Sequence, residues 1–317
     1  MKKILVVSLT NLGDAILSYP AIHALWAAYP NAQFHLLVSS RNRELFEGNS
    51  QVSRIWVRQK RAPFYEQAAL VAQLMGERFD LVVDFPNSMI PGFLWGAKRA
   101  PFFRKPPPPD EHRAQTHLNL VAALVGVPPL FKGVRMPYGP PEEAAVKVWL
   151  EPNRRPVVMV PGARSHTKRW SASGFARVGD RLAREQNAQI LLAGEPAERP
   201  IAGEVRACMK QPAVDLVGKT TLRQLAALLA RTKLVITNDS AGLHAAEVMS
   251  VPVVAIFGPT DEKKYGPQNP RSLVVRRHLV CAPCEKALCA YDQECMRWVT
   301  AEEVYAAAVK ILEAADT

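Results

Sequence analysis

Asp14 is the first side chain along the sequence with the chemistry to act on a bound ligand. It follows the apolar run of residues 3–8, whose continuous Ile, Leu and Val content predicts a buried strand, and Gly13 precedes it as a turn residue. Open parallel sheets bind ligands beyond the carboxyl ends of their strands, so a carboxylate here could take a proton from a hydroxyl group. Asp is also favoured in the first turn of a helix, and position alone favours that structural interpretation.

A basic loop, VPGARSHTKRWS (residues 160–171), follows another predicted strand at residues 156–160. Gly162 permits a tight turn, and the loop carries the basic side chains Arg164, His166, Lys168 and Arg169. A solvated basic loop is the structural alternative. Because the loop leaves the carboxyl end of a strand, however, it is expected at the edge where a parallel sheet holds its ligands.

The stretch VITNDSAGLHAAEV (residues 235–248) repeats this design, with a strand end followed directly by a helix. Asp239 or Ser240 is the expected cap, and the helix is expected to begin near Leu243 with free backbone N–H groups. Such a helix start attracts anions, and phosphate is its natural ligand. The alternative is a well-capped helix in which His244 has its own hydrogen-bond partner.

The sequence FGPTD (residues 257–261) ends the next predicted strand with another tight turn on the same sheet edge. Three strand-end loops in the second half of the chain thus carry glycine, hydroxyl and basic residues. Together they favour a diphosphate site over three unrelated turns.

The elements that must position these loops alternate between short strands and helices, a rhythm typical of parallel sheets covered on both faces. The rhythm stops in the proline-rich residues 98–113, which predict an extended surface segment, and again in residues 126–143, which predict an interdomain linker. We expect two consecutive α/β domains, at residues 1–140 and 141–317. Further predicted strands are residues 33–38, 54–57, 81–85, 188–193, 214–217, 234–237 and 251–257; predicted helices are residues 15–28, 43–47, 65–77, 117–125, 173–186, 222–230 and 301–315.

Two common phosphate-binding motifs are absent from the sequence. The turn after the first strand has one glycine instead of G-x-G-x-x-G, which disfavours a nicotinamide cofactor. The stretch LVGKTT (residues 216–221) resembles the end of a P-loop, but Ala213 stands where that motif needs glycine. We therefore interpret Gly218 as a turn residue and Thr220 or Thr221 as a helix cap.

Four of the five cysteines crowd into residues 281–295, with the spacing C-x2-C-x4-C-x5-C. Structural zinc sites usually have two C-x2-C pairs, and this segment has one. A zinc or iron–sulfur site and a loop of reduced, packed cysteines are both open, and the single pair favours reduced cysteines without a metal. The residues concerned are Cys281, Cys284, Cys289 and Cys295.

The chain has a net charge of +11, which favours an anionic partner: nucleic acid, a membrane surface or a phosphorylated substrate. A basic stripe interleaved with aromatic residues is lacking, which argues against nucleic acid. The first apolar run is too short for a signal peptide, and no stretch has the length of a membrane span. We expect a cytoplasmic protein.

Four stretches of this sequence, in order, resemble the bacterial heptosyltransferases of glycosyltransferase family nine, in particular their second branch. They are LTNLGDAILSYPAIHALWAAYP, PGARSHTKRW, TNDSAGLHAAEVMSVPVVAIFGPTD and CAPCEKALCAYDQECM. The resemblance implies the α/β GT-B architecture, in which two Rossmann-like domains face each other across a cleft. It further implies that the first domain binds the acceptor, that the second binds the nucleotide sugar, and that the final helix returns to the first domain.

The same resemblance implies an inverting transfer of L-glycero-D-manno-heptose from ADP-heptose to the inner core of lipopolysaccharide. The acceptor would be an anionic glycolipid, reached by peripheral contact with the inner face of the inner membrane. Because the sequence lacks a D-x-D pair, no divalent ion or other cofactor is expected to be required. The alternatives are a related GT-B enzyme for another nucleotide sugar and, in another class, a basic nucleic-acid-binding module.

Site residues follow from the matched motifs. The resemblance implies that Asp14 is the catalytic base, that Lys168 binds the diphosphate, and that Glu198, rather than Glu195, holds the nucleoside. One departure is Ala241, which stands where the family usually has glycine. The full donor set is Gly13, Arg164, Ser165, Lys168, Glu198, Asp239, Ser240, Ala241, Gly242 and His244. The candidate acceptor contacts are Arg99, Arg104, Lys105 and Arg113, for which a solvated basic loop is an equally favoured alternative.

Overall fold

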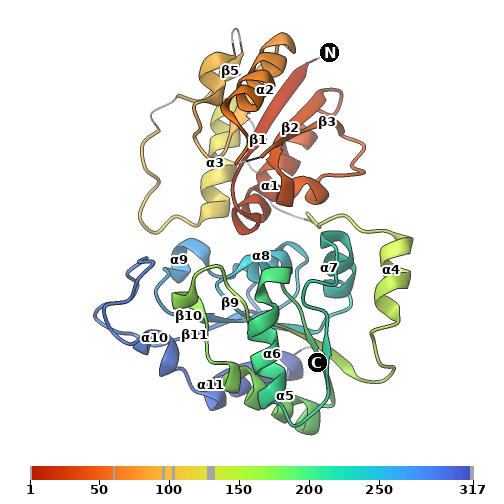
Figure 1. Cartoon of the computed structure of the whole chain (residues 1–317), viewed down its shortest axis with the longest axis vertical. Helices are drawn as coiled ribbons and strands as arrows, with labels where there is room; N and C mark the ends of the chain where they lie inside the picture. Colours follow the sequence, from red (N-terminus) through yellow and green to blue (C-terminus); the bar gives the residue numbers. More distant parts are fainter. Residues whose placement is uncertain (1, 60, 95–96, 102–103, 127–132, 315–317) are drawn as a thin grey trace. The chain divides into compact units, whose positions relative to one another are not determined.

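The computed structural model describes residues 2–59, 61–94, 97–101, 104–126 and 133–314. The chain divides into two compact units between Pro137 and Tyr138. Each unit is built on one parallel sheet flanked by helices (Figure 1).

The first unit has a five-stranded sheet in the order β3-β2-β1-β4-β5. Its central strands are buried over almost their whole length, as expected of a parallel sheet covered by helices. Its elements are β1 (Lys3–Ser8), α1 (Leu12–Ala28), β2 (Gln33–Ser39), the 3-10 helix η1 (Ser40–Leu45), β3 (Val52–Arg58), α2 (Phe64–Gly76), β4 (Leu81–Asp84), the 3-10 helix η2 (Ile90–Phe93), β5 (Lys98–Arg99) and α3 (Arg113–Val125).

The second unit has a six-stranded sheet in the order β11-β10-β9-β6-β7-β8. Counted from β6, this is the 3-2-1-4-5-6 order of a Rossmann fold. Its elements are α4 (Pro140–Lys147), β6 (Arg155–Val160), the 3-10 helix η3 (His166–Lys168), α5 (Ala172–Glu185), β7 (Ala188–Leu192), the 3-10 helix η4 (Pro196–Glu198), α6 (Arg199–Cys208), β8 (Ala213–Asp215), α7 (Leu222–Leu229), β9 (Leu234–Asn238), α8 (Ala241–Val248), β10 (Val253–Phe257), α9 (Glu262–Tyr265), β11 (Leu273–Arg276), α10 (Glu294–Arg297) and α11 (Ala301–Glu313).

The expectation that the final helix returns to the first domain is wrong. α11 packs on α5 and on β9, β10 and β11 of the second unit. Its apolar residues Val304, Ala308 and Ile311 are buried in the same core as Phe175 of α5. The Tyr305 hydroxyl also donates a hydrogen bond to Glu185 Oε2 at 2.7 Å. The apolar stripe of α11 is therefore covered within its own unit.

Smaller differences concern element ends. α1 begins at Leu12, so Asp14 lies inside its first turn. The helix expected at residues 43–47 is a 3-10 helix at residues 40–45. Strand β11 was not predicted, because it is short and only partly buried. Of the expected linker, residues 127–132 lie outside the described residues, and its end is the start of α4, where the Glu142 side chain accepts a hydrogen bond from the Gly139 N–H.

Candidate functional site

Each sheet has one topological switch point, where the strand order reverses. It lies between β1 and β4 in the first unit and between β6 and β9 in the second. Open α/β sheets bind ligands beyond the carboxyl ends of the strands at this point. Asp14 follows β1, and Lys168 and Asp239 follow β6 and β9, so these sequence-predicted residues follow the strands at the two switch points.

Lys168 and Asp239 form an ion pair across the switch point of the second unit. Lys168 Nζ lies 2.6 Å from Asp239 Oδ2. The Asp239 side chain is only 5 % exposed, whereas that of Lys168 is 31 % exposed. The lysine therefore holds its ammonium group at the surface end of the pair, 5.9 Å from the centre of the Tyr265 ring. A buried carboxylate that orients a half-exposed cation leaves the cation available to an anionic ligand.

Asn238, a residue that the sequence analysis did not select, fixes the basic loop beside this pair. Its Oδ1 accepts a hydrogen bond from the Trp170 backbone N–H at 3.0 Å, and its Nδ2 donates to the Pro161 carbonyl at 2.8 Å. The Trp170 indole N–H in turn donates to the Val299 carbonyl. Both ends of the loop that carries Lys168 are thus tied to the end of β9.

The start of α8 has the geometry expected of an anion-binding helix end. Ser240 is the N-cap, and its hydroxyl accepts a hydrogen bond from the Gly242 N–H at 3.2 Å. A Cβ atom on Gly242 would lie 2.8 Å from Val160 Cγ2, so glycine allows the helix to pack closely on β6. Ala241 is the first helical residue, and His244 is buried one turn further on.

Glu198 lies against two glycines at the ends of neighbouring strands. Its Oε2 accepts a hydrogen bond from the Glu195 N–H at 2.8 Å. A Cβ atom on Gly162 would lie 2.1 Å from the Glu198 carboxyl carbon, and one on Gly194 would lie 2.6 Å from Oε2. Burial raises the pKa of Glu198 above its usual range. The glycines thus let a half-buried carboxyl group approach the loop that contains Lys168.

Other members of the expected donor set are less confined. Arg164 is exposed, and the Ser165 hydroxyl is 2.8 Å from the Thr167 hydroxyl.

In the FGPTD turn, Thr260 is buried, and its hydroxyl has no hydrogen-bond partner in the part of the chain that the structure describes. This is the third strand-end loop, and its hydroxyl group is unused.

In the first unit, Asp14 is held by the cap of α1. The Asn11 side chain accepts a hydrogen bond from the Asp14 N–H at 3.1 Å, and its Nδ2 donates to Asp14 Oδ2 at 2.7 Å. The side chain of Asn42 donates to the carbonyls of Ser8 and Thr10 and so fixes the loop from β1. Asp14 therefore lies in the capped first turn of a helix, as the structural interpretation expects. The hydrogen bond from Asn11 orients its carboxylate without burying it.

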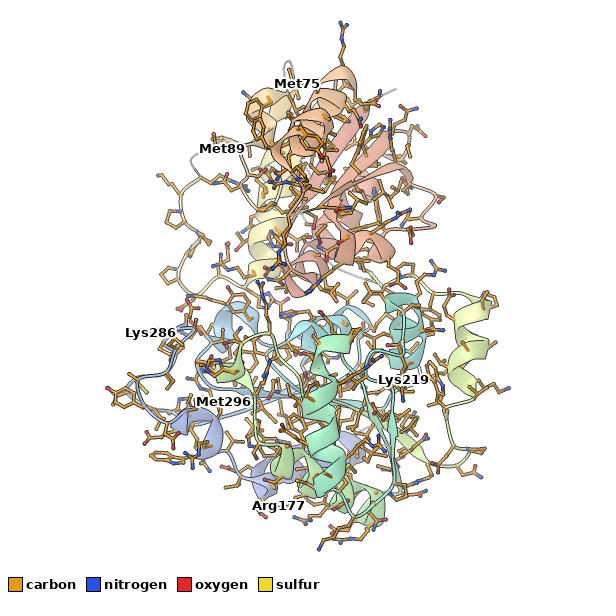
Figure 2. The ribbon with its side chains drawn as sticks, viewed as in Figure 1. Met75, Met89, Arg177, Lys219, Lys286 and Met296 are labelled. Atoms are coloured by element: carbon orange, nitrogen blue, oxygen red, sulfur yellow. The ribbon has the colours of Figure 1, made fainter. Side chains whose placement is uncertain are left out.

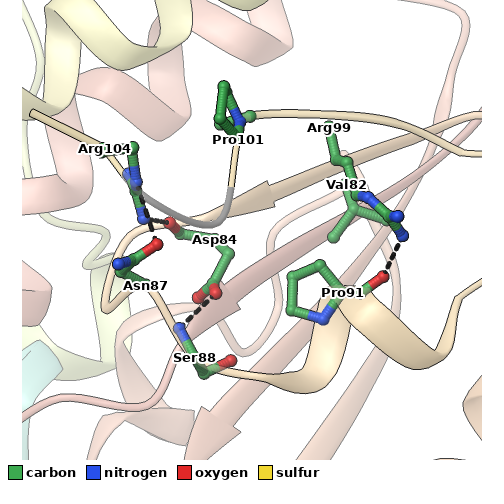
Figure 3. A pocket seen from close by; sticks show the side chains of 9 residues that line it. Val82, Asp84, Asn87, Ser88, Pro91, Arg99, Pro101 and Arg104 are labelled. Atoms are coloured by element: carbon green, nitrogen blue, oxygen red, sulfur yellow. Dashed lines mark hydrogen bonds between the residues drawn. The ribbon is translucent and has the colours of Figure 1, made fainter.

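A second acid, Asp84, lies at the carboxyl end of β4 and was missed by the sequence analysis (Figure 3). It is 6 % exposed, and burial raises its pKa to about 6, a rise that hydrogen bonding to Ser88 and, to a smaller extent, the nearby Arg104 oppose. Its Oδ2 accepts a hydrogen bond from the Ser88 N–H, whereas Oδ1 has no partner among the described residues. The signal in the sequence was of the same kind as for Asp14: an acid close to the carboxyl end of an apolar strand, in LVVDF.

Asp84 gives the stability of the protein a defined pH dependence. Its pKa is higher when folded, so the ionised form destabilises the fold, and stability falls as the pH rises from about 4 to about 6. The difference from the ordinary aspartate pKa of 3.8 corresponds to about 3 kcal/mol. The Asp84→Asn variant lacks this titration. Its free energy of unfolding in urea, minus that of wild type, is therefore expected to increase by about 3 kcal/mol between about pH 4 and pH 7.5. A difference that does not change with pH would contradict the raised pKa. Asp80→Asn, at the amino end of the same strand, is the control.

Of the four residues expected to contact the acceptor, two line one pocket and two do not. Arg99 and Arg104 line one pocket with Asp84, and both donate hydrogen bonds to backbone carbonyls, Arg99 to Pro91 and Arg104 to Asp84. Lys105 is exposed in the proline-rich segment, and Arg113 is the first residue of α3. Neither of the latter two lines this pocket.

The cysteine segment is attached to the FGPTD turn, because the N–H groups of Cys284 and Glu285 both donate to the Pro259 carbonyl. Cys295 and its neighbour Met296 (labelled in Figure 2) are buried close to Gly258. Burial raises the pKa of the Cys295 thiol, and Cys289, Cys281 and Cys284 add to this effect. Within the described ranges, no three His, Cys, Asp or Glu side chains are arranged to hold a metal ion.

Two consecutive Rossmann-like units of this kind make the GT-B architecture, and comparison with solved structures agrees. A family 9 glycosyltransferase from Veillonella parvula DSM 2008 superposes with a TM-score of 0.84 at 21 % identity, covering 99 % of this chain and 97 % of the other. The E. coli ADP-heptose LPS heptosyltransferase II gives a TM-score of 0.81, also at 21 % identity, over the full length of both chains.

The sequence comparisons define the family. The model for glycosyltransferase family 9 (heptosyltransferase) matches residues 67–294. Lipooligosaccharide heptosyltransferase 2 of Campylobacter jejuni (serotype O:6, strain 81116) is 30 % identical over 95 % of this chain and 96 % of its own length. The chain belongs to glycosyltransferase family 9 and is a glycosyltransferase. Among the helices of the described residues, none is both long and apolar enough to span a membrane.

Proposed function

We propose that this protein transfers L-glycero-D-manno-heptose from ADP-heptose to an acceptor sugar in the inner core of lipopolysaccharide, with inversion at the anomeric carbon. The observation that carries the proposal is the Lys168–Asp239 pair beside the capped start of α8 at a Rossmann switch point. The full-length likeness to a lipooligosaccharide heptosyltransferase supports the same donor and acceptor classes.

In the proposed reaction the acceptor hydroxyl oxygen forms a bond to the anomeric carbon while the bond from that carbon to the diphosphate oxygen breaks. Asp14 takes the proton of the attacking hydroxyl, and ADP leaves with the bonding electron pair. Negative charge therefore develops on the leaving diphosphate. Fixed positive groups stabilise this charge without reorganisation, and Lys168 and the N–H groups at the start of α8 supply them.

The remaining donor contacts are assigned by their place in the second unit. Glu198, in its glycine-lined position, is assigned to the nucleoside, because a half-buried carboxyl group accepts hydrogen bonds from ribose hydroxyls. Ser240, Ala241 and Gly242 are assigned to the diphosphate through the first turn of α8. These charges perform the role that a divalent ion has in other transferases, so we propose that none is required.

The net charge of +11 supports an anionic acceptor and peripheral action at the inner face of the inner membrane. Phosphate and carboxylate groups of the inner core would be attracted to such a surface.

A panel of nucleotides separates this proposal from a related enzyme for another sugar donor. Thermal unfolding of the protein with ADP, UDP, GDP and CDP is expected to show the largest rise in Tm with ADP, because only a ligand of the folded state raises it. A larger rise with UDP or GDP would identify another nucleotide sugar. Binding of random duplex DNA at near-physiological salt, with a steep salt dependence, would instead favour a nucleic-acid-binding module.

A further inference from the structure

The pocket at the carboxyl end of β4 contains a buried hydrogen-bond acceptor that the described chain leaves unused (Figure 3). Asp84 Oδ1 has no hydrogen-bond partner among the described residues, and the residue is only 6 % exposed. An unpaired buried carboxylate oxygen is costly, so a folded protein is expected to keep one where a ligand completes its hydrogen bonds. The group that completes it must be a hydrogen-bond donor.

The two arginines of the pocket are already engaged and fix its walls. Arg99 Nη1 donates to the carbonyls of Pro91 and Leu94. Arg104 Nη2 donates to the Asp84 carbonyl at 2.6 Å, and its Nε donates to Asn87 Oδ1 at 3.2 Å. The charge of Arg104 opposes the rise in the Asp84 pKa that burial causes. A phosphate placed against Oδ1 would meet a like charge, whereas a sugar hydroxyl supplies the missing proton.

The pocket lies at the switch point of the first unit. Asp84 is paired with Val7 in the parallel register of β4 and β1, and the Phe85 N–H donates to the Val7 carbonyl. The loop after β1 leads into α1, in which Asp14 is the third residue. Asp84 therefore ends one strand and Asp14 follows the adjacent strand of the same sheet, in the unit that does not carry the Lys168 site.

We propose that Asp84 accepts a hydrogen bond from a hydroxyl group of the acceptor sugar and so helps to select and place that sugar for transfer. This inference rests on the proposed function, and it assigns to Asp84 a role in acceptor binding that is separate from proton transfer. Arg99 and Arg104 then shape the acceptor pocket through the backbone and through Asn87, rather than as free cations.

The test measures acceptor binding and transfer separately in the full-length protein. Truncated inner-core acceptor is titrated against wild type and the Asp84→Ala and Asp84→Asn variants without donor, and transfer from ADP-heptose is then assayed. The acceptor Kd and KM are expected to rise by about 10–100-fold in Asp84→Ala, the effect of losing a hydrogen bond to a charged group. Asp84→Asn, which can still form a neutral hydrogen bond, is expected to lie between wild type and Asp84→Ala. The affinity for ADP and the KM for ADP-heptose are expected to stay unchanged in both variants.

The matched control is Asp80→Asn, an acid at the other end of β4 whose Oδ2 accepts a hydrogen bond from the Lys3 N–H. It is expected to bind the acceptor like wild type. Wild-type transfer together with an unchanged acceptor Kd and KM in Asp84→Ala would overturn the inference and leave the proposed function standing. The Asp84→Asn variant preserves the shape of the side chain. Parallel losses of ADP binding and acceptor binding in this variant would indicate a folding defect and would also overturn the inference. A wild-type protein that neither binds nor heptosylates the acceptor would overturn both.

Discussion

Replacing Asp14 with asparagine is expected to lower kcat for heptosyl transfer by about 10²–10⁴-fold, the range for loss of a general base. The variant keeps the size of the side chain and the cap of α1, in which Asn11 accepts from the residue 14 N–H. The loss of charge in the first helical turn costs only about 0.3–1 kcal/mol of stability. ADP binding should be unchanged, because the nucleotide contacts are assigned to the second unit. Initial rates and ADP titration calorimetry measure the two effects.

The chain offers a matched control for helix capping. Glu303 occupies the same position in the first turn of α11, where it accepts a hydrogen bond from the Thr300 N–H at 3.0 Å. Glu303→Gln removes an equivalent capping charge from a helix without an assigned role in the reaction, and its transfer rate should equal that of wild type. Equal rates in Asp14→Asn and Glu303→Gln would show that Asp14 only caps α1.

Replacing Lys168 with alanine is expected to weaken ADP binding by about 10–100-fold, the effect of losing a charge-assisted hydrogen bond. The same change leaves the buried Asp239 carboxylate without its partner, which should lower stability by about 1–3 kcal/mol. These two consequences must be separated, because an unstable protein also binds weakly. Calorimetric titration with ADP and urea denaturation are therefore measured on the same samples.

The double variant Lys168→Ala/Asp239→Asn separates them. It removes the unpaired charge, so it should recover most of the stability lost by Lys168→Ala. If Lys168 binds the diphosphate, ADP affinity stays low in the double variant. Recovery of both stability and ADP affinity would mean that Lys168 acts only as the structural partner of Asp239.

Much of the fold follows from short-range patterns. Continuous apolar runs such as residues 156–160 mark buried parallel strands, and their strand-end loops are where the expected donor residues lie. Ser240 caps α8 and was one of the two residues expected there; Thr221, also one of two expected residues, caps α7. Caps and buried strands are determined by neighbouring residues, which is why they are visible in sequence.

Contacts between distant elements were not predictable in this way. The Lys168–Asp239 pair and the hydrogen bonds of Asn238 depend on β6 and β9 being neighbours in the sheet. The local periodicity of a sequence does not predict strand order. The apolar stripe of α11 is visible in the sequence, but not the surface that covers it. The expected return of this helix to the first domain came from the family resemblance, and the packing of α11 within the second unit shows that it was wrong.

Asp84 is a different case, because its sequence signal was present. LVVDF ends an apolar strand in an acid, as the first strand leads to Asp14. The sequence does not show that β4 lies directly beside β1. It also does not show that one Asp84 carboxylate oxygen lacks a hydrogen-bond partner among the described residues. A buried acid of this kind is conspicuous only once the strand order and burial are known.

The most direct test of the central claim is mass spectrometry of the acceptor after incubation with ADP-heptose. A truncated inner-core acceptor is treated in parallel with wild type, Asp14→Asn and Glu303→Gln. The account predicts an acceptor heavier by one heptosyl residue with wild type and Glu303→Gln, and little or no such product with Asp14→Asn. An acceptor of unchanged mass with wild type, or equal product with Asp14→Asn, would contradict it.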